Sequence, residues 1–355
     1  MTDTGIQVRP AKLHDFFRLR AMRSDASSPE RESGSLGQRV IDSWPRVLFS
    51  RRERRSYVAF SGNVALGLLE LTTDPANHRW VISRIATNWR AFGRAEHSRE
   101  LIWQELALQA IRSAGASRAK RVHATFPESS AVIPSLVAIG FNEYAQDTVL
   151  LAPSLPKREP AEIARRQESS DLWAVHQLYH SVTPRPVQYA EALTSNYWSK
   201  AMPGEPAPRS YVVEDGLEIV AHCRVVPLAG GLALYPMVQP GRLELLQPLI
   251  HDVLADLNPP SSTRIRSVVP DYLQEYVSRL EDLGFVPEGR QTRLVKYTVV
   301  ARRMQFRGVD ELSRDVKERV VAGTPLSYVS PGSDQQPGGR FNGSGESSKE
   351  RNGYC

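Results

Sequence analysis

The stretch RWVISRIATNWRAFGRAEHSRELIWQELALQAIRSAG, residues 79–115, predicts a strand, a loop and a helix in succession. Residues 79–88 are rich in β-branched and aromatic side chains, as is typical of a strand. Residues 98–115 repeat apolar side chains on one helical face, Ser98 is a typical N-cap, and Gly115 lies where a C-terminal glycine belongs. Two readings of the loop between them are open, a cradle for a nucleotide cofactor and an arginine-rich surface loop.

The flanking sequence alternates between the two kinds of periodicity. A hairpin is predicted where two β-rich runs meet at Gly62-Asn63. The remaining predicted elements before residue 153 are strands at 6–10, 121–126 and 147–152 and helices at 11–22 and 131–141.

The pattern then restarts after a proline-rich connector, residues 153–160. RSYV occurs at 55–58 and again at 209–212, and a helix that runs into Gly-Phe ends at 140–141 and again at 284–285. Predicted elements of the second half are helices at 171–182, 241–257 and 272–285, a hairpin at 209–227, and strands at 231–238, 264–270 and 293–300. We expect a duplicated unit.

The sequence therefore predicts an α/β protein with a mixed sheet in two tandem domains, residues 1–152 and 161–300, joined by the connector. Residues 301–321 are expected to hold a short helix, and residues 322–355 have the polar, Gly- and Ser-rich composition of a disordered tail.

Composition restricts the class of protein. Two cysteines exclude a disulfide framework, no metal site is predicted, and neither a signal peptide nor an apolar run of about 18 residues is present, so we expect a cytoplasmic protein without a membrane span. Residues 1–152 hold 21 Lys and Arg against 15 Asp and Glu, an excess equal to the net charge of +6 of the whole chain. Without a stacking-aromatic array or a basic recognition helix, this excess does not favour nucleic acid as the partner.

In the order of its elements, each half resembles the Gcn5-related N-acetyltransferase (GNAT) fold: a helix, a hairpin, a strand that leads through a loop into a helix, and a later helix that ends in Gly-Phe. The whole chain is similar to tandem members of this family. The resemblance implies acetyl-CoA, or another acyl-CoA, as co-substrate and a small-molecule or peptide amine as acceptor.

The cofactor loop of the family carries the motif [RQ]-x-x-G-x-[GA], which Arg90, Gly93 and Ala95 match, with Arg94 inside it. A glycine allows the backbone to approach a diphosphate, and the helix N-terminus attracts the anion. The motif ends six residues before the first apolar pair of the helix, Leu101-Ile102, which is a longer spacing than the family shows.

Catalytic groups are inferred from the same resemblance. Family members use a glutamate near the strand before the loop as a base and a tyrosine four residues before the Gly of Gly-Phe as an acid. Glu70 and His123 are the candidate bases here, with a solvent-facing strand position and a structural histidine as their alternatives. Leucine, Leu136 or Leu280, stands at the usual tyrosine position in each half, which leaves Tyr144 as the candidate acid.

The second half has only QPGR, residues 239–242, where the cofactor loop is expected, and Pro248 is predicted to break the middle of its helix. We therefore expect a degenerate second copy. Two functions stay open: an N-acyltransferase whose first half binds the cofactor, and a catalytically degenerate tandem protein that binds a ligand or a partner.

Overall fold

The computed structural model describes residues 5–19, 22–27, 54–74, 78–88, 98–152, 159–199, 208–228 and 231–298. All of them belong to one compact unit, residues 1–300. The predicted cofactor loop, most of the connector and both C-terminal segments, 301–321 and 322–355, lie outside the described residues.

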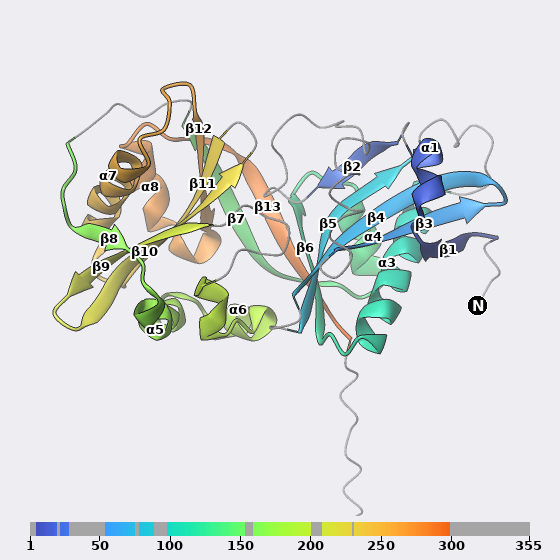
Figure 1. Cartoon of the computed structure of the whole chain (residues 1–355), viewed down its shortest axis with the longest axis horizontal. Helices are drawn as coiled ribbons and strands as arrows, with labels where there is room; N and C mark the ends of the chain where they lie inside the picture. Colours follow the sequence, from blue (N-terminus) through green and yellow to red (C-terminus); the bar gives the residue numbers. More distant parts are fainter. Residues whose placement is uncertain are drawn as a thin grey trace, which may run out of the picture. The chain divides into compact units, whose positions relative to one another are not determined.

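Apart from β2, which was not predicted, the elements of the first half follow the predicted order (Figure 1). They are β1 (Gln7–Pro10), the 3-10 helix η1 (Leu13–Asp15), α1 (Phe16–Leu19), β2 (Arg23–Ser27), β3 (Arg54–Ser61), β4 (Val64–Asp74), β5 (Arg79–Thr87), α3 (Arg99–Ala116), β6 (Arg121–Pro127), α4 (Val132–Ala138) and β7 (Asn142–Ala152).

The second half repeats this succession with α6 and η6 in the place of β2. Its elements are β8 (Ala164–Arg166), η5 (Ser169–Asp171), α5 (Leu172–Val182), α6 (Arg185–Glu191), η6 (Ser195–Ser199), β9 (Arg209–Asp215), β10 (Glu218–Leu228), β11 (Gly231–Val238), η7 (Leu243–Leu245), α7 (Leu246–Leu257), β12 (Arg264–Pro270), η8 (Asp271–Leu273), α8 (Glu275–Glu281) and β13 (Val286–Tyr297).

A single mixed sheet runs through both halves, in the order β1-β3-β4-β5-β6-β13-β7-β12-β11-β10-β9-β8. Two neighbouring pairs are parallel, β5 with β6 and β11 with β12. A helix connects each parallel pair, α3 in the first half and α7 in the second, because parallel neighbours need a crossover connection. The predicted mixed α/β fold is confirmed.

The halves exchange their last strands at the centre of this sheet. β13, the last strand of the second half, pairs with β6 of the first half, and β7 of the first half pairs with β12 of the second. β13 and β7 also pair with each other. Figure 1 shows β7 and β13 crossing between the two ends of the molecule.

The hydrophobic cores follow the exchange. Leu294 of β13 is buried in the core that α3 and α4 form with the first half of the sheet. Leu150 and Ala152 of β7 are buried in the core of the second half, beside α5 and α7. Each core therefore contains side chains from the other half of the sequence.

The duplication is visible in a repeated ion pair as well as in the element order. Arg9 forms a bidentate pair with Asp15 at 2.7 and 2.8 Å, and Arg165 forms one with Asp171 at 2.8 and 2.9 Å. Each aspartate also accepts the backbone N–H three residues before it, that of Lys12 or of the equivalent residue in the second half. The pair fixes the turn between the first strand and the first helix of each half.

The helix ends agree in part with those that the sequence predicts. Gly140 and Gly284 follow α4 and α8 with φ of 86° and 92°, a left-handed conformation that favours glycine. Gly115 lies inside α3 instead of terminating it, and Arg118 takes the left-handed conformation, with φ of 61°. Pro248 is the third residue of α7 and does not break it, because the N–H that proline lacks has no helical partner in the first turn.

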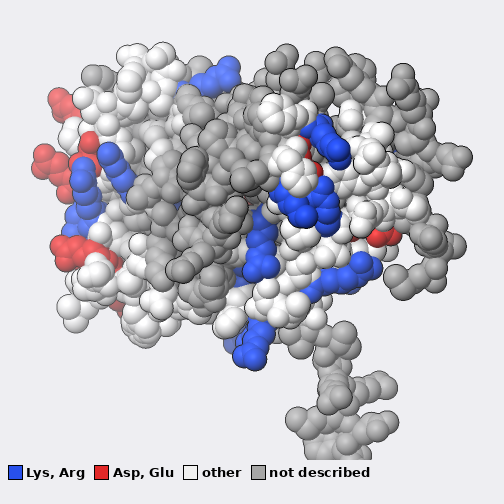
Figure 2. Space-filling model, turned by 45° about the vertical axis from the view of Figure 1, so that its right-hand side comes forward, with Lys and Arg blue, Asp and Glu red and all other residues white. Residues whose placement is uncertain are grey.

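Basic and acidic side chains are also unevenly distributed on the surface. Figure 2 shows Lys and Arg along the middle of one face, whereas most of the acidic side chains visible there gather at the end formed by the second half. Among the described helices, none is long and apolar enough to cross a membrane.

Candidate functional site

A cavity of about 180 Å³ lies where the two halves meet. We call it the central cavity. Its walls come from β4, β5, β6, β7 and β13 on one side and from α5, α6, η6, η8, β10, β11 and β12 on the other. The lining side chains that can take part in binding or chemistry are His123, Tyr144, Arg79, Arg224, Glu191, Arg293, Tyr179, Tyr197 and Trp198.

His123 and Tyr144 bring two of the predicted catalytic residues together. His123 projects from β6 and Tyr144 from β7, and their ring centroids lie 6.0 Å apart with the rings nearly perpendicular. The side chain of His123 is buried, and neither of its ring nitrogens has a hydrogen-bond partner among the described residues. A buried polar atom without a protein partner is one that a ligand can satisfy.

The surroundings fix the protonation of both groups. Burial, followed by the nearby charges of Arg79, Arg121 and Arg293, holds the pKa of His123 well below its usual value, so the imidazole stays neutral. Burial, with Glu191 as the next cause, raises the pKa of Tyr144, so the phenol stays protonated. The cavity therefore holds a neutral base beside a proton donor.

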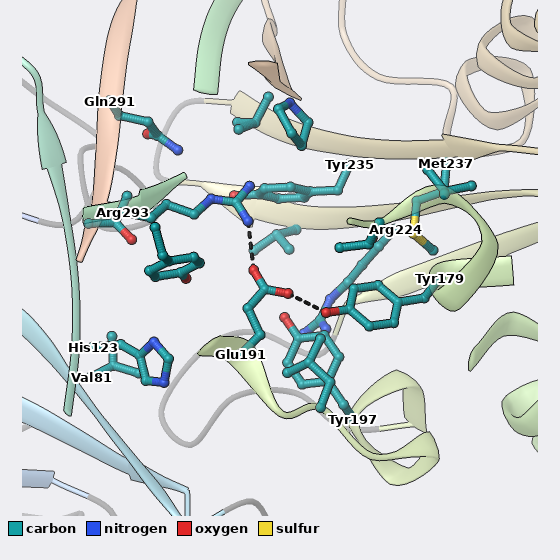
Figure 3. Close-up of a pocket in the computed structure, with 18 of the residues that line it drawn as sticks. Val81, His123, Tyr179, Glu191, Tyr197, Arg224, Tyr235, Met237, Gln291 and Arg293 are labelled. Carbon is teal, nitrogen blue, oxygen red and sulfur yellow. Dashed lines mark hydrogen bonds and ion pairs between the residues drawn. The ribbon is translucent and has the colours of Figure 1, made fainter. Parts of the chain in front are cut away.

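Glu191 lies in the middle of the cavity at the end of α6 (Figure 3). Its carboxylate accepts a hydrogen bond from the hydroxyl of Tyr179 at 2.8 Å and one from Arg293 at 2.7 Å. Arg293 also binds Asp147 at 2.6 Å. These contacts join α5 and α6 to β7 and β13 through buried charge.

Arg79 and Arg224 approach the same aromatic ring from opposite halves. The guanidinium carbon of Arg79, on β5, lies 5.9 Å from the ring centroid of Tyr197, and that of Arg224, on β10, lies 4.7 Å from it. Both distances are in the range of cation–π contacts. Nε of Arg79 has no hydrogen-bond partner among the described residues.

A chain of hydrogen bonds holds the helices that cover the cavity. Nε1 of Trp198 donates to Nδ1 of His176 at 3.2 Å, so a neutral His176 carries its proton on Nε2, 3.1 Å from Nε2 of His180. Nδ1 of His180 then donates to the side-chain oxygen of Gln188 at 2.5 Å, and Nε2 of Gln188 donates to the carbonyl of Thr183. The chain is complete only while both histidines are neutral.

Glu70 does not belong to the central cavity. It is a buried residue of β4, and its carboxylate lies 4.0 Å from Nε of Arg84 on β5. The solvent-facing position offered as its alternative is wrong, because β4 is buried on both faces, by α3 on one and by α1 on the other.

Arg90, Gly93, Arg94 and Ala95, the predicted cofactor residues, lie outside the described residues, and their neighbours can be placed. β5 ends at Thr87, and α3 begins with Ser98 as its N-cap, whose hydroxyl accepts the N–H of Leu101. The predicted N-cap is confirmed, and a helix N-terminus follows the loop, as binding of a diphosphate requires.

A notch lies between β5 and the central cavity, where β5 and β6 diverge. The two strands pair only over residues 79–82 and 121–124, and Ser83 and Thr125, the next residue of each, line the cavity. Along the notch, residues 84–87 of β5 pair with β2. An extended thioester arm that ran from the loop to the cavity would meet β2 at this edge, so the described residues fit such a donor only in part.

The corresponding notch of the second half lies between β11 and β12, which pair over residues 231–234 and 264–267. The hydroxyl of Tyr276, on α8, accepts the N–H of Val238 at 2.7 Å and donates to its carbonyl at 2.9 Å. This side chain therefore already satisfies the backbone at the end of β11. Arg242, which stands where the loop motif needs glycine, forms an exposed ion pair with Asp215.

Sequence reasoning missed the second-half wall of the cavity. No element was predicted for residues 183–199, which form α6 and η6 and carry Glu191, Tyr197 and Trp198. The signal that could have located α6 is Pro186 near the start of a helical run, since proline is favoured in the first turn.

Solved structures with a similar fold include three whose names share one family. A tandem GNAT protein from the clavulanic acid biosynthesis pathway has a TM-score of 0.51 and 14% identity, over 83% of this chain and 99% of its own. A GCN5-related N-acetyltransferase from Sphaerobacter thermophilus has a TM-score of 0.48 and 16% identity, over 84% and 98% of the two chains. One from Kribbella flavida has a TM-score of 0.44 and 12% identity, over 82% and 72%.

No family model matches the sequence, and no curated protein matches it. At these identities the likeness concerns the fold alone. The chain has the fold of the tandem Gcn5-related N-acetyltransferases, as the sequence predicts.

Proposed function

We propose that the protein is an N-acyltransferase that transfers an acetyl or related acyl group from a coenzyme A thioester to an amine bound in the central cavity. The fold supports the class of reaction. The observation that carries the proposal is the pair of His123 and Tyr144, a neutral imidazole with two unpaired ring nitrogens beside a protonated phenol in one cavity wall.

The reaction breaks a C–S bond and forms a C–N bond, while the nitrogen loses a proton and the sulfur gains one. The thioester supplies the acyl carbonyl and the thiol leaving group when it is bound. His123 has a free ring nitrogen that can take the proton of a neutral amine as the C–N bond forms. Tyr144 has the proton that the leaving sulfur needs, and the proton held by His123 then restores the phenol of Tyr144.

The residues that would hold the thioester are Arg90, Gly93, Arg94 and Ala95, ahead of the N-terminus of α3. Arginine neutralises a diphosphate, and a glycine leaves room for it near the backbone. These assignments rest on the motif and on its place between β5 and α3.

The test is binding and transfer with the full chain. Acetyl-CoA at about 100 times its dissociation constant should stabilise the protein by about 2.7 kcal/mol, which is visible as a rise in melting temperature. Gly93→Glu places bulk and negative charge in the predicted loop and should remove this rise. Thiol release with a panel of amines should fall about 10²- to 10⁴-fold in His123→Gln.

His78→Asn is the matched control, because His78 is exposed and its φ of 50° suits asparagine. It should leave thiol release unchanged. A wild-type protein that shows no thermal shift at millimolar acetyl-CoA, or a His123→Gln variant as active as the wild type, would contradict the proposal.

A second candidate, a catalytically degenerate protein that binds a ligand, is favoured by two observations. β2 pairs with the edge of β5 in the notch, and leucine occupies the usual tyrosine position of both halves, Leu136 and Leu280, where each side chain is buried in a core. This candidate predicts that amines or their analogues bind to the central cavity while acetyl-CoA is not turned over.

A further inference from the structure

Trp198 belongs to the part of the cavity wall that the second half provides. It lies on η6, its side chain is buried, and it lines the central cavity beside Tyr197. Its ring packs against Tyr179 of α5 and His222 of β10, with centroids 5.5 Å apart in both contacts. Its indole N–H donates to Nδ1 of His176, on α5, at 3.2 Å. The hold on this part of the wall therefore depends on whether His176 can accept.

The protonation of His176 follows from that of Gln188 and His180. The side-chain nitrogen of Gln188 donates to the carbonyls of His180 at 2.9 Å and Thr183 at 2.6 Å, so the amide oxygen is the atom that faces Nδ1 of His180. An amide oxygen only accepts, so this Nδ1 carries a proton. Nε2 of a neutral His180 is then an acceptor, and it receives the N–H of Nε2 of His176 at 3.1 Å. Nδ1 of His176 is left to accept from Trp198.

One added proton breaks this arrangement wherever it binds. A proton on Nε2 of His180 places two N–H groups against each other at the contact with His176. His176 can relieve that contact only by moving its own proton to Nδ1, where it opposes the N–H of Trp198. A proton that binds directly to Nδ1 of His176 has the same effect. Because a charged hydrogen bond between the two rings is stronger than a neutral one, the favoured protonated forms are those that keep it and release Trp198.

The groups around the two histidines leave this change to the pair itself. Burial, followed by the charge of His180, lowers the pKa of His176, so we expect the change below about pH 6.5. His222, on the other side of Trp198, has a pKa of about 3 and stays neutral above pH 4.5. The other titratable or charged groups that the packed elements bring near the pair are Tyr179, which donates to Glu191, Arg224 beside Tyr197, and the ion pair of Asp171 with Arg165.

We propose that His176 and His180 are positioning residues of the central cavity and form a pH switch: when the pair takes up a proton, Trp198 loses its hydrogen bond and its fixed place in the cavity wall. The switch goes beyond the proposed function, because it concerns the shape of the cavity and needs neither a thioester nor an amine. A ligand that packs against Trp198 would bind more weakly in acid than at neutral pH.

The test is NMR of the full chain, without ligand, after labelling of tryptophan and histidine with nitrogen-15. At pH 7.5 the two imidazoles should be opposite tautomers, with the proton on Nε2 in His176 and on Nδ1 in His180. Between pH 7.5 and pH 4.5 the indole N–H signal of Trp198 should move in one transition. The signal of Trp173, which is exposed on the same helix, is the internal reference and should stay in place. Trp198→Phe assigns the signal by its loss.

His176→Asn/His180→Gln is the variant that removes the titration. An asparagine oxygen can accept at the position of Nδ1 and a glutamine oxygen at the position of Nε2, and neither amide titrates. The Trp198 signal of this variant should stay constant, and at pH 4.5 its indole N–H should exchange with water about tenfold more slowly than in the wild type. His78→Asn, which removes an exposed histidine, is the matched control and should titrate as the wild type does.

Three results would overturn the inference: the same tautomer in both histidines at pH 7.5, a Trp198 signal that stays constant down to pH 4.5, or one that moves equally in the double variant. The first two come from the wild type alone, so they decide the inference even if the double variant does not fold. Failure of the proposed function is a different result. A Trp198 transition without acyl transfer to any amine would remove the acyltransferase and leave the switch in place.

Discussion

At the scale of single residues, the central cavity is surrounded by histidines that the fold keeps neutral. Burial is the first cause of the lowered pKa of His123, His176 and His222. For His222, burial and the charge of Arg224 lower the pKa to about 3. Its Nε2 lies 3.1 Å from the side-chain oxygen of Gln167, whose own Nε2 donates to the carbonyl of Trp198 at 3.2 Å.

These shifts make stability depend on pH with a definite sign. A histidine with a lower pKa in the folded state is more readily protonated when unfolded, so its contribution is complete above about pH 6.5 and is lost as the pH falls. His222 should therefore cost about 1.4 kcal/mol for each pH unit between about 6.5 and 3. We predict that His222→Asn, which cannot be protonated, flattens the decline of the unfolding free energy below pH 6.5.

The measurement is urea unfolding between pH 7 and pH 4. His222→Asn should be less stable than the wild type at pH 7 and should lose less stability on acidification, whereas the exposed His78→Asn should follow the wild type. A variant whose free energy of unfolding falls as steeply as that of the wild type would show that His222 is not neutral in the folded protein.

At the scale of elements, the sequence predicts best those features that local chemistry decides. The Gly62-Asn63 hairpin, the N-cap at Ser98 and the two Gly-Phe helix ends each depend on a few adjacent residues. β2 was not predicted, because its sequence RSDAS has no strand pattern and it forms by pairing with β5. Tertiary pairing of this kind overrides local propensity.

Only a part of the candidate site could be predicted from the sequence. His123 and Tyr144 were singled out from the family resemblance, and the structure brings them together. Arg79, Arg224 and Glu191 come from three elements distant in sequence, and nothing in their local sequence shows that they share a cavity. Only the arrangement of the halves in the sheet brings these side chains together.

β2 leads to a prediction about the donor. If a thioester arm runs from the loop at 89–97 to the cavity, it competes with β2 for the edge of β5. The pairing of β2 with β5 shifts register between Ser24 and Ala26, so Asp25 and Ala26 lie at an irregular point of this pairing. Replacing both with proline removes both N–H groups from this point and weakens the pairing, and we expect CoA to bind at least threefold more tightly to Asp25→Pro/Ala26→Pro.

Isothermal titration with CoA measures this affinity, and the melting temperature reports whether the sheet is intact. Leu217→Pro, in the fully exposed turn between β9 and β10, is a proline control outside the notch and should bind CoA as the wild type does. Weaker binding to the double variant would mean that β2 helps to hold the donor, and unchanged binding would mean that the donor does not follow the β5 edge.

At the scale of the whole molecule, the exchange of β7 and β13 explains why a duplicated unit keeps a second copy without a plausible cofactor loop. The second half provides β13, whose Arg293 and Gln291 line the central cavity, and the first half provides β7 with Tyr144 and Asp147. Neither half contains the full cavity wall. The second copy is therefore needed to complete the site even where it carries no chemistry of its own.

The strand exchange also predicts that the two halves stay associated after the connector between them is cleaved by a protease. A protease site engineered into residues 153–160 would separate β7 from β8 without cutting any strand of the described residues. Each fragment would keep a strand in the core of the other, Leu150 and Ala152 in one direction and Leu294 in the other. We predict that the cleaved halves elute together on a sizing column and unfold in a single thermal transition.

Fragments expressed separately, 1–152 and 161–355, give the complementary test. Each lacks a central strand that its own core needs, so each should show little cooperative unfolding alone, and mixing the two should restore the transition of the intact chain. If the cleaved halves separate on the column and each melts with its own transition, the exchange is dispensable for folding, and the shared cavity would then require a docking step after the halves have folded.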